Sequence, residues 1–226
     1  MSEPVRLLTV NLLHDGATKD QLIRLLDTTS PDVVVAQELN HKCAEVIDDR
    51  FSHTHLDPQD DFTGRGIGTN LDARFGDVPM PARHASTAAL QVGGDVWNLA
   101  GVHLVNPIKF PWWRSVRSRT GQVEAVIEWS AQLTDDPLLV VGDFNASPRW
   151  PAYRRLRDRW IDLVEEHAVE TGVDLMPTWG WRPGWKKMLR IDHVFGSGLT
   201  AVDVSVHQVR GSDHAAVVVD LVSRAD

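Results

Sequence analysis

Hydrophobic residues occur along the chain in short runs of two kinds, and these predict an alternation of strands and helices. Runs rich in Val, Ile and Leu predict buried strands; they occupy residues 5–10, 32–37, 96–105, 138–142, 190–195, 201–209 and 215–222. Apolar residues at helical spacing predict helices over residues 17–28, 114–133 and 149–160. Residues 56–95 are less regular and predict short strands joined by exposed loops. Helices that cover apolar sheets from outside indicate a layered α/β domain.

Composition favours one folded enzyme domain over residues 1–226. Hydrophobic residues make up 42% and charged residues 24%, which excludes disorder as the main state. The lone Cys43 cannot form an intramolecular disulfide. No apolar run approaches the roughly 20 residues that span a bilayer. The acidic start carries no signal-peptide pattern. We therefore expect a cytoplasmic protein without a transmembrane segment, and a monomer.

The charge is unevenly distributed. The net charge is −8, yet residues 109–119, 149–159 and 182–190 hold 4, 5 and 4 basic residues with a single acid. Tryptophans lie within or beside these three stretches, at positions 112, 113, 150, 181 and 185. Each stretch alone is typical of a solvated helix face or a basic loop. If the three converge, arginine with aromatic residues favours a surface that contacts phosphates or bases.

Polar residues stand where the predicted strands end. They are Asn11, Glu38, His103, Asp143, Asn145, Asp192 and the run Ser212-Asp213-His214. The alternation of Asp143 and Asn145 puts both side chains on one side of an extended segment. A single Asp at a strand end is usually a turn former or a cap. Because α/β folds bind ligands just beyond strand ends, several such residues together predict a site.

The residue types limit the chemistry of that site. Carboxylates and amides without thiols favour magnesium or manganese over zinc. The sequence contains no His-Glu-x-x-His, no Gly-x-Ser-x-Gly, no Gly-Lys-Ser/Thr P-loop and no Gly-x-Gly-x-x-Gly fingerprint. Metal-assisted attack of water on a phosphate ester needs a cation, a base and donors to the phosphoryl oxygens, and this set supplies all three.

The motifs resemble those of the endonuclease/exonuclease/phosphatase family, and they occur in the family's order from residue 10 to residue 214. They are Val-Asn at 10–11, Gln-Glu at 37–38, Val-His-Leu at 102–104, Gly-Asp-Phe-Asn at 142–145, Arg-Ile-Asp-His-Val-Phe at 190–195 and Ser-Asp-His at 212–214. Members include AP endonucleases, pancreatic-type deoxyribonucleases, neutral sphingomyelinases and inositol polyphosphate 5-phosphatases. The resemblance implies a four-layer α/β sandwich, with two mixed sheets face to face, helices outside and the site at one end.

The resemblance also implies a metal site and a base. Glu38 would be the principal ligand of Mg²⁺ or Mn²⁺, with Asn11 beside it and Asp213 completing or bridging the site. Asp143 would activate the attacking water for in-line displacement, with Asn145 steadying the phosphoryl oxygens.

Two histidines complete the roles that the resemblance implies. His214 would donate to the phosphate while Asp192 holds it, and His103 matches the histidine of the nuclease-like and sphingomyelinase-like members. AP endonucleases have a tyrosine near this site, whereas the chain's only tyrosine, Tyr153, lies in a different segment. That departure disfavours an abasic-site substrate. For His193, the expected role is packing or support of the site.

The substrate is left open by the sequence. The candidate substrate contacts are Arg114, Arg119, Trp179, Trp181, Trp185 and Lys186. A basic, tryptophan-rich loop suits nucleic acid, above all single strands, so a nuclease-like phosphodiesterase is the first hypothesis. A phospholipid head group or a small phosphorylated metabolite is the alternative, and a non-catalytic binding module is the third. Pro183-Gly184 predicts a turn that exposes at least one indole on the face that holds Glu38 and Asp143.

Overall fold

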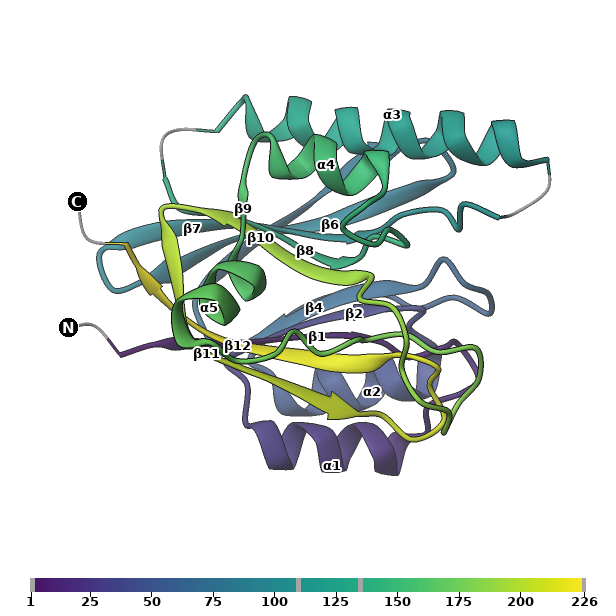
Figure 1. The fold of residues 1–226 in the computed structure, drawn as a ribbon. Coiled ribbons are helices and arrows are strands. Elements are labelled where there is room, and N and C mark those ends of the chain that lie inside the picture. Colours follow the sequence, from purple (N-terminus) through teal and green to yellow (C-terminus); the bar gives the residue numbers. More distant parts are fainter. Residues whose placement is uncertain (1–2, 109–110, 134–135, 225–226) are drawn as a thin grey trace.

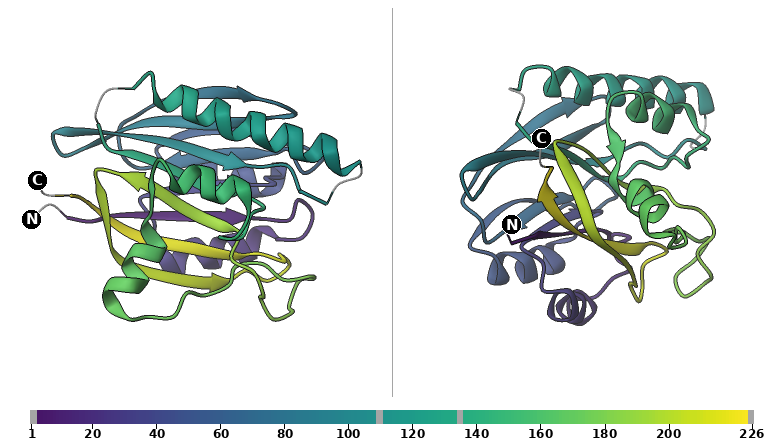
Figure 2. Two further views of the ribbon diagram at one scale, coloured as in Figure 1. Left: turned by 45° about the horizontal axis from the view of Figure 1, so that its top comes forward. Right: turned by 60° about the vertical axis from the view of Figure 1, so that its left-hand side comes forward.

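The computed structural model describes residues 3–108, 111–133 and 136–224, and their elements stack in four layers. Five helices lie outside two facing sheets: α1 (Lys19–Thr29), α2 (His41–Arg50), α3 (Trp112–Ser130), α4 (Pro151–Arg157) and α5 (Leu163–Thr171). In Figure 1, α1 and α2 cover the lower sheet, α3 and α4 cover the upper sheet, and α5 lies at one side between them. The views in Figure 2 show the same layers from two other directions. This is the predicted four-layer sandwich.

Both sheets have six strands and both are mixed. The lower sheet has the order β11 (Leu199–Gln208), β12 (Ala215–Ser223), β1 (Val5–Asn11), β2 (Val33–Gln37), β4 (Arg65–Thr69) and β3 (His53–Asp57). The upper sheet has the order β5 (Ala73–Met80), β6 (Arg83–Val92), β7 (Asp95–His103), β8 (Leu138–Asp143), β10 (Asp192–Ser197) and β9 (Ile161–Asp162). The pairs β1–β2 and β7–β8 are parallel, and the other pairs are antiparallel.

The core lies between the sheets and under the helices. Leu7, Val33 and Val219 of the lower sheet and Leu99 and Val141 of the upper sheet belong to one buried cluster. Two further clusters fill the layers beneath α1 and α2 and beneath α3 and α4. The near-continuous Val and Leu runs of the sequence follow from this arrangement, because the central strands are buried on both faces.

The region at 56–95 differs in part from the prediction. It holds β5 and β6, strands of 8 and 10 residues that pair across a tight turn at Pro81-Ala82, where Met80 faces Arg83. β5 is an edge strand, which accounts for Pro79 within it and for its half-exposed polar positions. The expectation of short strands is confirmed for β4, which has 5 residues, and is wrong for β5 and β6. Half-exposed polar residues on the edge strand β5 obscure the apolar alternation.

The helices agree with the prediction only in part. The helix expected over 149–160 is the shorter α4, with Pro151 in its first turn. The apolar spacing did not predict α2 and α5, although each has a capping residue: Asn40 Oδ1 accepts from Cys43 N at 2.8 Å, and Asp162 Oδ1 accepts from Glu165 N at 3.2 Å. Within the described ranges, none of these helices has the length and apolar character needed to cross a membrane.

The topology brings the polar strand ends to one edge. Because β1 and β2 are parallel, Asn11 and Gln37 pair at their carboxyl ends. β7 and β8 end together in the same way, with His103 opposite Asp143. β10 runs antiparallel to β8, so its first residue, Asp192, also faces Asp143. The amino end of β1 and the carboxyl end of β12 lie at the opposite end of the molecule (Figure 1).

Candidate active site

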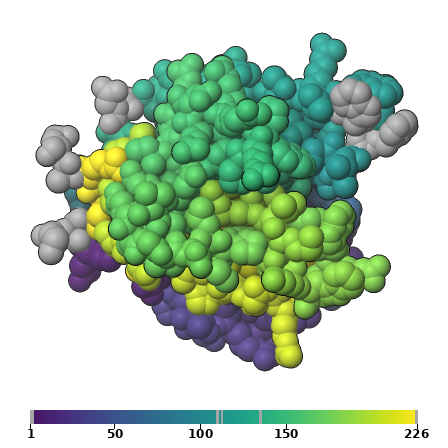
Figure 3. All heavy atoms as spheres, viewed as in Figure 1, coloured from purple at the N-terminus to yellow at the C-terminus, as the bar shows by residue number. Residues whose placement is uncertain are grey.

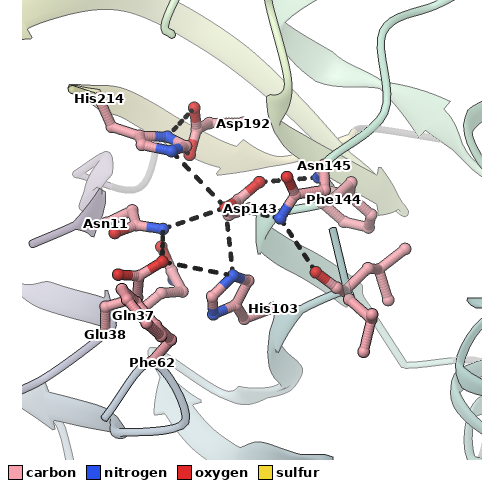
Figure 4. A network of polar contacts seen from close by, with 12 residues as sticks. Asn11, Gln37, Glu38, Phe62, His103, Asp143, Phe144, Asn145, Asp192 and His214 are labelled. Atoms are coloured by element: carbon pink, nitrogen blue, oxygen red, sulfur yellow. Dashed lines mark hydrogen bonds and ion pairs between the residues drawn. The ribbon is translucent and has the colours of Figure 1, made fainter. Parts of the chain in front are cut away.

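Asp143 Oδ2 is the point at which the polar side chains of the site meet (Figure 4). The side-chain amides of Asn11 and Asn145 donate to this oxygen at 3.0 and 3.1 Å. His103 Nε2 and His214 Nε2 lie 3.4 and 3.7 Å from it. The carboxylate is buried, and its other oxygen accepts from the backbone N–H of Asn145 at 2.7 Å. Side-chain N–H groups thus converge on one buried oxygen of Asp143, an arrangement that stabilises the negative charge of this carboxylate.

The loop Gly-Asp-Phe-Asn is built to hold Asp143 in place. Gly142 has φ +136°, and a Cβ there would lie 2.1 Å from the carbonyl oxygen of Val102, so only glycine fits. Phe144 turns the other way into the core, where its ring packs edge-on against Phe195. Asp143 and Asn145 consequently both line the cavity, as their alternation predicts.

Asn145 differs in detail from the role that the resemblance implies. Its two amide hydrogens are directed to the carbonyl oxygen of Leu104 at 3.0 Å and to Asp143 Oδ2 at 3.1 Å. The residue has φ +46°, in the left-handed region. In this geometry Asn145 orients Asp143 and has no amide hydrogen left for a phosphoryl oxygen.

Glu38 and Asp213 each aim a buried oxygen into the site. Among the described residues, Glu38 Oε2 and Asp213 Oδ1 have no hydrogen-bond partner. The opposite oxygens do have partners, because Asn11 Nδ2 donates to Glu38 Oε1 at 3.1 Å and Trp179 Nε1 donates to Asp213 Oδ2 at 3.0 Å. Leaving a buried carboxylate oxygen without a partner is costly. A hard cation with oxygen ligands fits this donor set.

A second group of potential ligands lies beside the first. One oxygen or nitrogen each from Asp143, Asp192 and His214 falls within 4.8 Å of the others in the described part of the chain. In this trio His214 Nδ1 already faces Asp192 Oδ2 at 2.9 Å, and Asp143 is bonded by both asparagines. The orphaned oxygens therefore favour Glu38 and Asp213 as the ligands. Asn11 Oδ1 accepts from Leu13 N at 2.9 Å, and its side-chain amide donates to Glu38 Oε1 and to Asp143 Oδ2.

His214 is held by three neighbours. Its backbone N–H donates to Ser212 Oγ at 3.0 Å, and that hydroxyl donates to the carbonyl oxygen of Asn11 at 2.7 Å. Burial alone would lower the pKa of His214, but the carboxylates of Asp192 and Asp143 raise it to about 10. The imidazole is therefore held as a cation that keeps a hydrogen on Nε2. Asp192 holds His214 in the geometry that the sequence resemblance implies.

Burial also shifts the two acidic groups that face the cavity. It raises the pKa of Asp143 to about 7, against the charge of His214, which lowers it. It raises the pKa of Glu38 as well, against the hydrogen bond from Asn11. A carboxylate whose pKa lies near neutrality is matched to general base catalysis.

Arg83 is a site residue that the sequence pattern did not reveal. Its Nη1 lies 2.7 Å from His103 Nδ1 and donates to the carbonyl oxygen of Phe62 at 2.5 Å. Burial, with the charges of Arg83 and His214, holds the pKa of His103 well below its ordinary value. Arg83 follows the Pro81-Ala82 turn in a region without a recognisable motif, so only the β5–β6 pairing could have pointed to it.

The site opens into a cavity of about 750 Å³. Its walls come from segments far apart in the sequence: Phe62 and Thr63, Asn106 and Ile108, and Trp179. Phe62 is exposed at the rim. This volume exceeds that of a single phosphate group and leaves room for the groups esterified to it.

The tryptophan-rich loop stands next to this cavity. Trp179 pairs with Leu189 at its base, and Trp185 N donates to the carbonyl oxygen of Arg182 at 3.1 Å across the Pro183-Gly184 turn. Gly184 has φ +77°, as a turn with glycine in its third position requires. The predicted turn is therefore present, and in Figure 3 the light-green segment around residues 180–190 projects from the surface.

Two indoles of the loop are exposed, as expected. Trp181 is 59% and Trp185 is 55% exposed. Trp181 packs edge-on against Trp179, with ring centroids 5.1 Å apart, and the Arg182 guanidinium lies 5.4 Å from the Trp185 ring centroid. Since Trp179 itself lines the cavity and contacts Asp213, the exposed indoles continue outward from the site.

The three basic stretches do not converge on the cavity. Of the described residues at 149–159, none lines it. Arg155 and Arg157 instead pair with Glu124 and Glu165 on the helices nearby. The interpretation of this stretch as a solvated helix face is the one that the structure supports.

The basic substrate candidates occupy different environments. Arg114 lines the cavity and Lys186 is exposed on the loop. Arg119, by contrast, is 6% exposed and donates to the carbonyl oxygens of Val105 and Phe144 at 2.6 and 3.2 Å. Lys187 is also buried, with Nζ 3.4 Å from the carbonyl oxygen of Ser212. Burial and these protein contacts make Arg119 and Lys187 supports of the site rather than surface contacts.

A buried polar network supports the site from behind. His193 Nε2 lies 2.8 Å from the carbonyl oxygen of Ala146, directly after Asn145. Arg190 Nη1 donates to Asp162 Oδ2 at 2.7 Å and lies 2.9 Å from His193 Nδ1. The packing and support role expected for His193 agrees with these contacts.

The arrangement agrees with a sequence match. The profile of the endonuclease/exonuclease/phosphatase family matches residues 8–214, from β1 to the end of the Ser-Asp-His motif. The chain belongs to this family. It is therefore a phosphoric ester hydrolase of a family that generally depends on divalent metal ions. Comparison with curated protein sequences finds no significant match.

Solved structures share the fold at low sequence identity. The human Nocturnin catalytic domain, solved with a bound sulfate anion, has a TM-score of 0.77 at 16% identity, covering 99% of this chain and 96% of that one. A variant of the 3′ phosphatase NExo from Neisseria, bound to a product DNA hairpin, has a TM-score of 0.68 at 20% identity. The match covers 95% of this chain and 98% of that one. TDP2 from D. rerio, in complex with a single-strand DNA product, has a TM-score of 0.72 at 15% identity. The match covers 97% of this chain and 99% of that one.

Proposed function

We propose that this phosphoric ester hydrolase is a Mg²⁺- or Mn²⁺-dependent phosphodiesterase that acts on single-stranded nucleic acid. The exposed indoles of Trp181 and Trp185, on a loop whose base contacts Asp213, are the observation that carries the proposal of this substrate. The metal dependence rests on the orphaned oxygens of Glu38 and Asp213.

Glu38 and Asp213 would hold the cation through these two oxygens, with Asn11 orienting Glu38. When bound there, a divalent cation polarises the phosphoryl group and offsets the charge that develops on it. Oxygen ligands favour Mg²⁺ or Mn²⁺ over softer ions.

Asp143 is the proposed base. Its carboxylate takes a proton from the attacking water, which then forms the new P–O bond in line with the departing oxygen. Asn11 and Asn145 fix the carboxylate for this step, since both donate to Oδ2. General base catalysis by a positioned side chain contributes about 10²–10⁴-fold to the rate.

His214 and His103 are the proposed donors to the phosphoryl oxygens. Their Nε2 atoms lie on the two sides of Asp143 Oδ2 and line the cavity. His214 carries a positive charge next to Asp192, so its donor is charge-assisted. Arg114 lines the cavity as a further contact for the negatively charged substrate.

A nucleic-acid substrate accounts for the loop better than a small ester does. Bases stack on exposed aromatic side chains without regard to sequence. Arg182 and Lys186, both exposed beside the indoles, supply positive charge for the backbone. NExo and TDP2, which share the fold, have been solved with DNA, and the latter with a single strand.

The test measures binding and hydrolysis by Trp181→Ala/Trp185→Ala. With a fluorescent single-stranded oligonucleotide, we expect binding to weaken by about 1–3 kcal/mol for each stacked base. Hydrolysis of bis-p-nitrophenyl phosphate, which carries no nucleotide bases, should be unchanged. Val169→Ala is the control, because Val169 is an exposed apolar residue of α5 outside the cavity wall.

Oligonucleotide binding that is unchanged in the double variant would reject nucleic acid as the substrate. Single-stranded DNA and single-stranded RNA are both assayed, beside a duplex plasmid and lipid vesicles. Turnover of the lipid or of a small phosphoester, without turnover of either single strand, would support the alternative substrate class.

A further inference from the structure

Arg83 contacts the one ring nitrogen of His103 that points away from the site. Arg83 Nη1 lies 2.7 Å from His103 Nδ1, while His103 Nε2 faces Asp143 Oδ2 at 3.4 Å and Glu38 Oε1 at 3.7 Å. His103 is 6% exposed, so water contributes little to its hydrogen bonding. The Arg83 contact therefore determines which ring nitrogen of His103 carries a hydrogen.

The donor inventory gives the direction of this hydrogen bond. A guanidinium has five N–H donors and no acceptor. Arg83 must donate, so His103 Nδ1 must accept and carries no hydrogen. The remaining ring hydrogen lies on Nε2, which points into the cavity. His103 is thus a neutral imidazole with its donor directed at the reaction centre.

The position of Arg83 is fixed on both sides. In the β6–β7 pairing Ser86 faces Gly101, and the same antiparallel register, continued, places His84 opposite His103 and Arg83 one residue further along the strand. The same Nη1 donates to the carbonyl oxygen of Phe62 at 2.5 Å, which ties it to the loop at the cavity rim. The carboxylates of Asp143, Glu38 and Asp61 lie near enough to stabilise its charge.

We propose that Arg83 is a positioning residue that locks His103 in the neutral form with hydrogen on Nε2, so that His103 acts only as a hydrogen-bond donor. The inference rests on the proposed role of His103 as a donor to the phosphoryl oxygens. It assigns different charge states to the two histidines of the site. His214 next to Asp192 is a charged donor, whereas His103 next to Arg83 is a neutral one.

The first test reads the tautomer directly. Long-range ¹H–¹⁵N correlation spectra of the metal-free protein, labelled in its histidine rings, distinguish hydrogen on Nε2 from hydrogen on Nδ1. His103→Ala identifies the signals of His103. We expect the Nε2–H form alone in the native protein and a mixture of forms in Arg83→Met. Hydrogen on Nδ1 in the native protein, or an unchanged pattern in Arg83→Met, would overturn the proposal.

The second test is a double-mutant cycle on bis-p-nitrophenyl phosphate hydrolysis. We expect Arg83→Met to lower kcat about 10-fold with little change in KM, since loss of one donor to the transition state costs up to about 10²–10³-fold. In the His103→Ala background the same substitution should change kcat less than about 2-fold. If the double variant instead shows the product of the two single-variant decreases in kcat, Arg83 acts on the substrate itself. That result would overturn a role through His103.

Arg65→Met is the matched control. Arg65 is a half-buried arginine of β4 that pairs with Asp57 and Asp77 rather than with His103. It should leave both the His103 spectrum and kcat unchanged. If Arg83→Met does not fold, the spectrum of the native protein still tests whether the hydrogen of His103 lies on Nε2. That spectrum needs neither metal nor substrate. A wrong prediction of the His103 tautomer can therefore be distinguished from a wrong proposal of phosphodiesterase activity.

Discussion

Glu38 and Asp143 are two buried carboxylates with different surroundings. Glu38 leaves one oxygen without a partner among the described residues, whereas Asp143 receives donors on both oxygens. The first environment suits a cation and the second holds a carboxylate in a fixed direction. This difference is the reason for assigning metal binding to Glu38 and proton transfer to Asp143.

Substitution should separate the two roles. Asp143→Asn should lower kcat on bis-p-nitrophenyl phosphate by about 10²-fold or more. Glu38→Gln should be folded and inactive, with much weaker Mn²⁺ binding by calorimetry than Asp143→Asn. Equal loss of Mn²⁺ binding in both variants would mean that the roles are exchanged. Full activity of Glu38→Gln at saturating Mg²⁺ would remove Glu38 from the site.

At this scale the sequence predicts residues whose position follows from a strand end. Asn11, Glu38 and Asp143 could be found because parallel strands end at one edge, and Asp192 because an antiparallel strand begins there. Arg119 was assigned to the substrate because charge is visible in a sequence and burial is not. Arg83, Arg119 and Lys187 all have environments that depend on pairing between distant segments.

At the scale of elements, the buried strands were predictable and the edge hairpin was not. β1, β2, β8 and β12 are mainly apolar because both of their faces are covered. β5 is an edge strand with half-exposed polar positions, so polar residues interrupt the pattern there. The four-layer architecture followed from the order of the motifs rather than from the periodicity alone.

The network behind the Gly-Asp-Phe-Asn loop gives a stability prediction. Asp162 is buried and pairs with Arg190 and His193. Asp162→Asn should destabilise the protein by about 3–5 kcal/mol at pH 7, because removal of one partner leaves the other charge buried. Urea unfolding measures this value. Glu124→Gln, which removes an exposed pair with Arg155, is the control and should cost less than about 1 kcal/mol.

The same pair predicts a pH dependence. Burial alone would raise the pKa of Asp162, but His193 and Arg190 hold it far below its ordinary value. A carboxyl group with a depressed pKa stabilises the folded state above the unfolded value of about 3.9, and this stabilisation is lost as the pH falls toward the folded pKa. The gap in unfolding free energy between native protein and Asp162→Asn should therefore narrow below about pH 4. A gap that is constant from pH 7 to pH 3 would contradict the charge assignment.

At the scale of the whole molecule, the net charge of −8 limits electrostatic attraction to nucleic acid. The basic residues proposed to contact the substrate are Arg114, which lines the cavity, and Arg182 and Lys186, which are exposed on the tryptophan-rich loop. Affinity for a single strand should then depend mainly on stacking with the indoles and on the cavity.

The salt dependence of binding tests this balance. Three phosphate contacts predict a slope of about −2 in a plot of log K against log salt concentration, at about 0.7 for each contact with a single strand. Fluorescence anisotropy between 50 and 300 mM KCl measures it. Lys186→Ala should flatten the slope by roughly 0.7. A native slope steeper than about −5 would show that other basic residues contact the strand.

The position of the cation is the central claim, and a crystal structure with Mn²⁺ tests it most directly. An anomalous difference map recorded at the manganese edge shows the ion independently of the surrounding density. The peak should lie between Glu38 Oε2 and Asp213 Oδ1, two buried carboxylate oxygens without hydrogen-bond partners among the described residues. A peak held by Asp143, Asp192 and His214 instead, with Glu38 free of it, would contradict the assignment of both the metal site and the base.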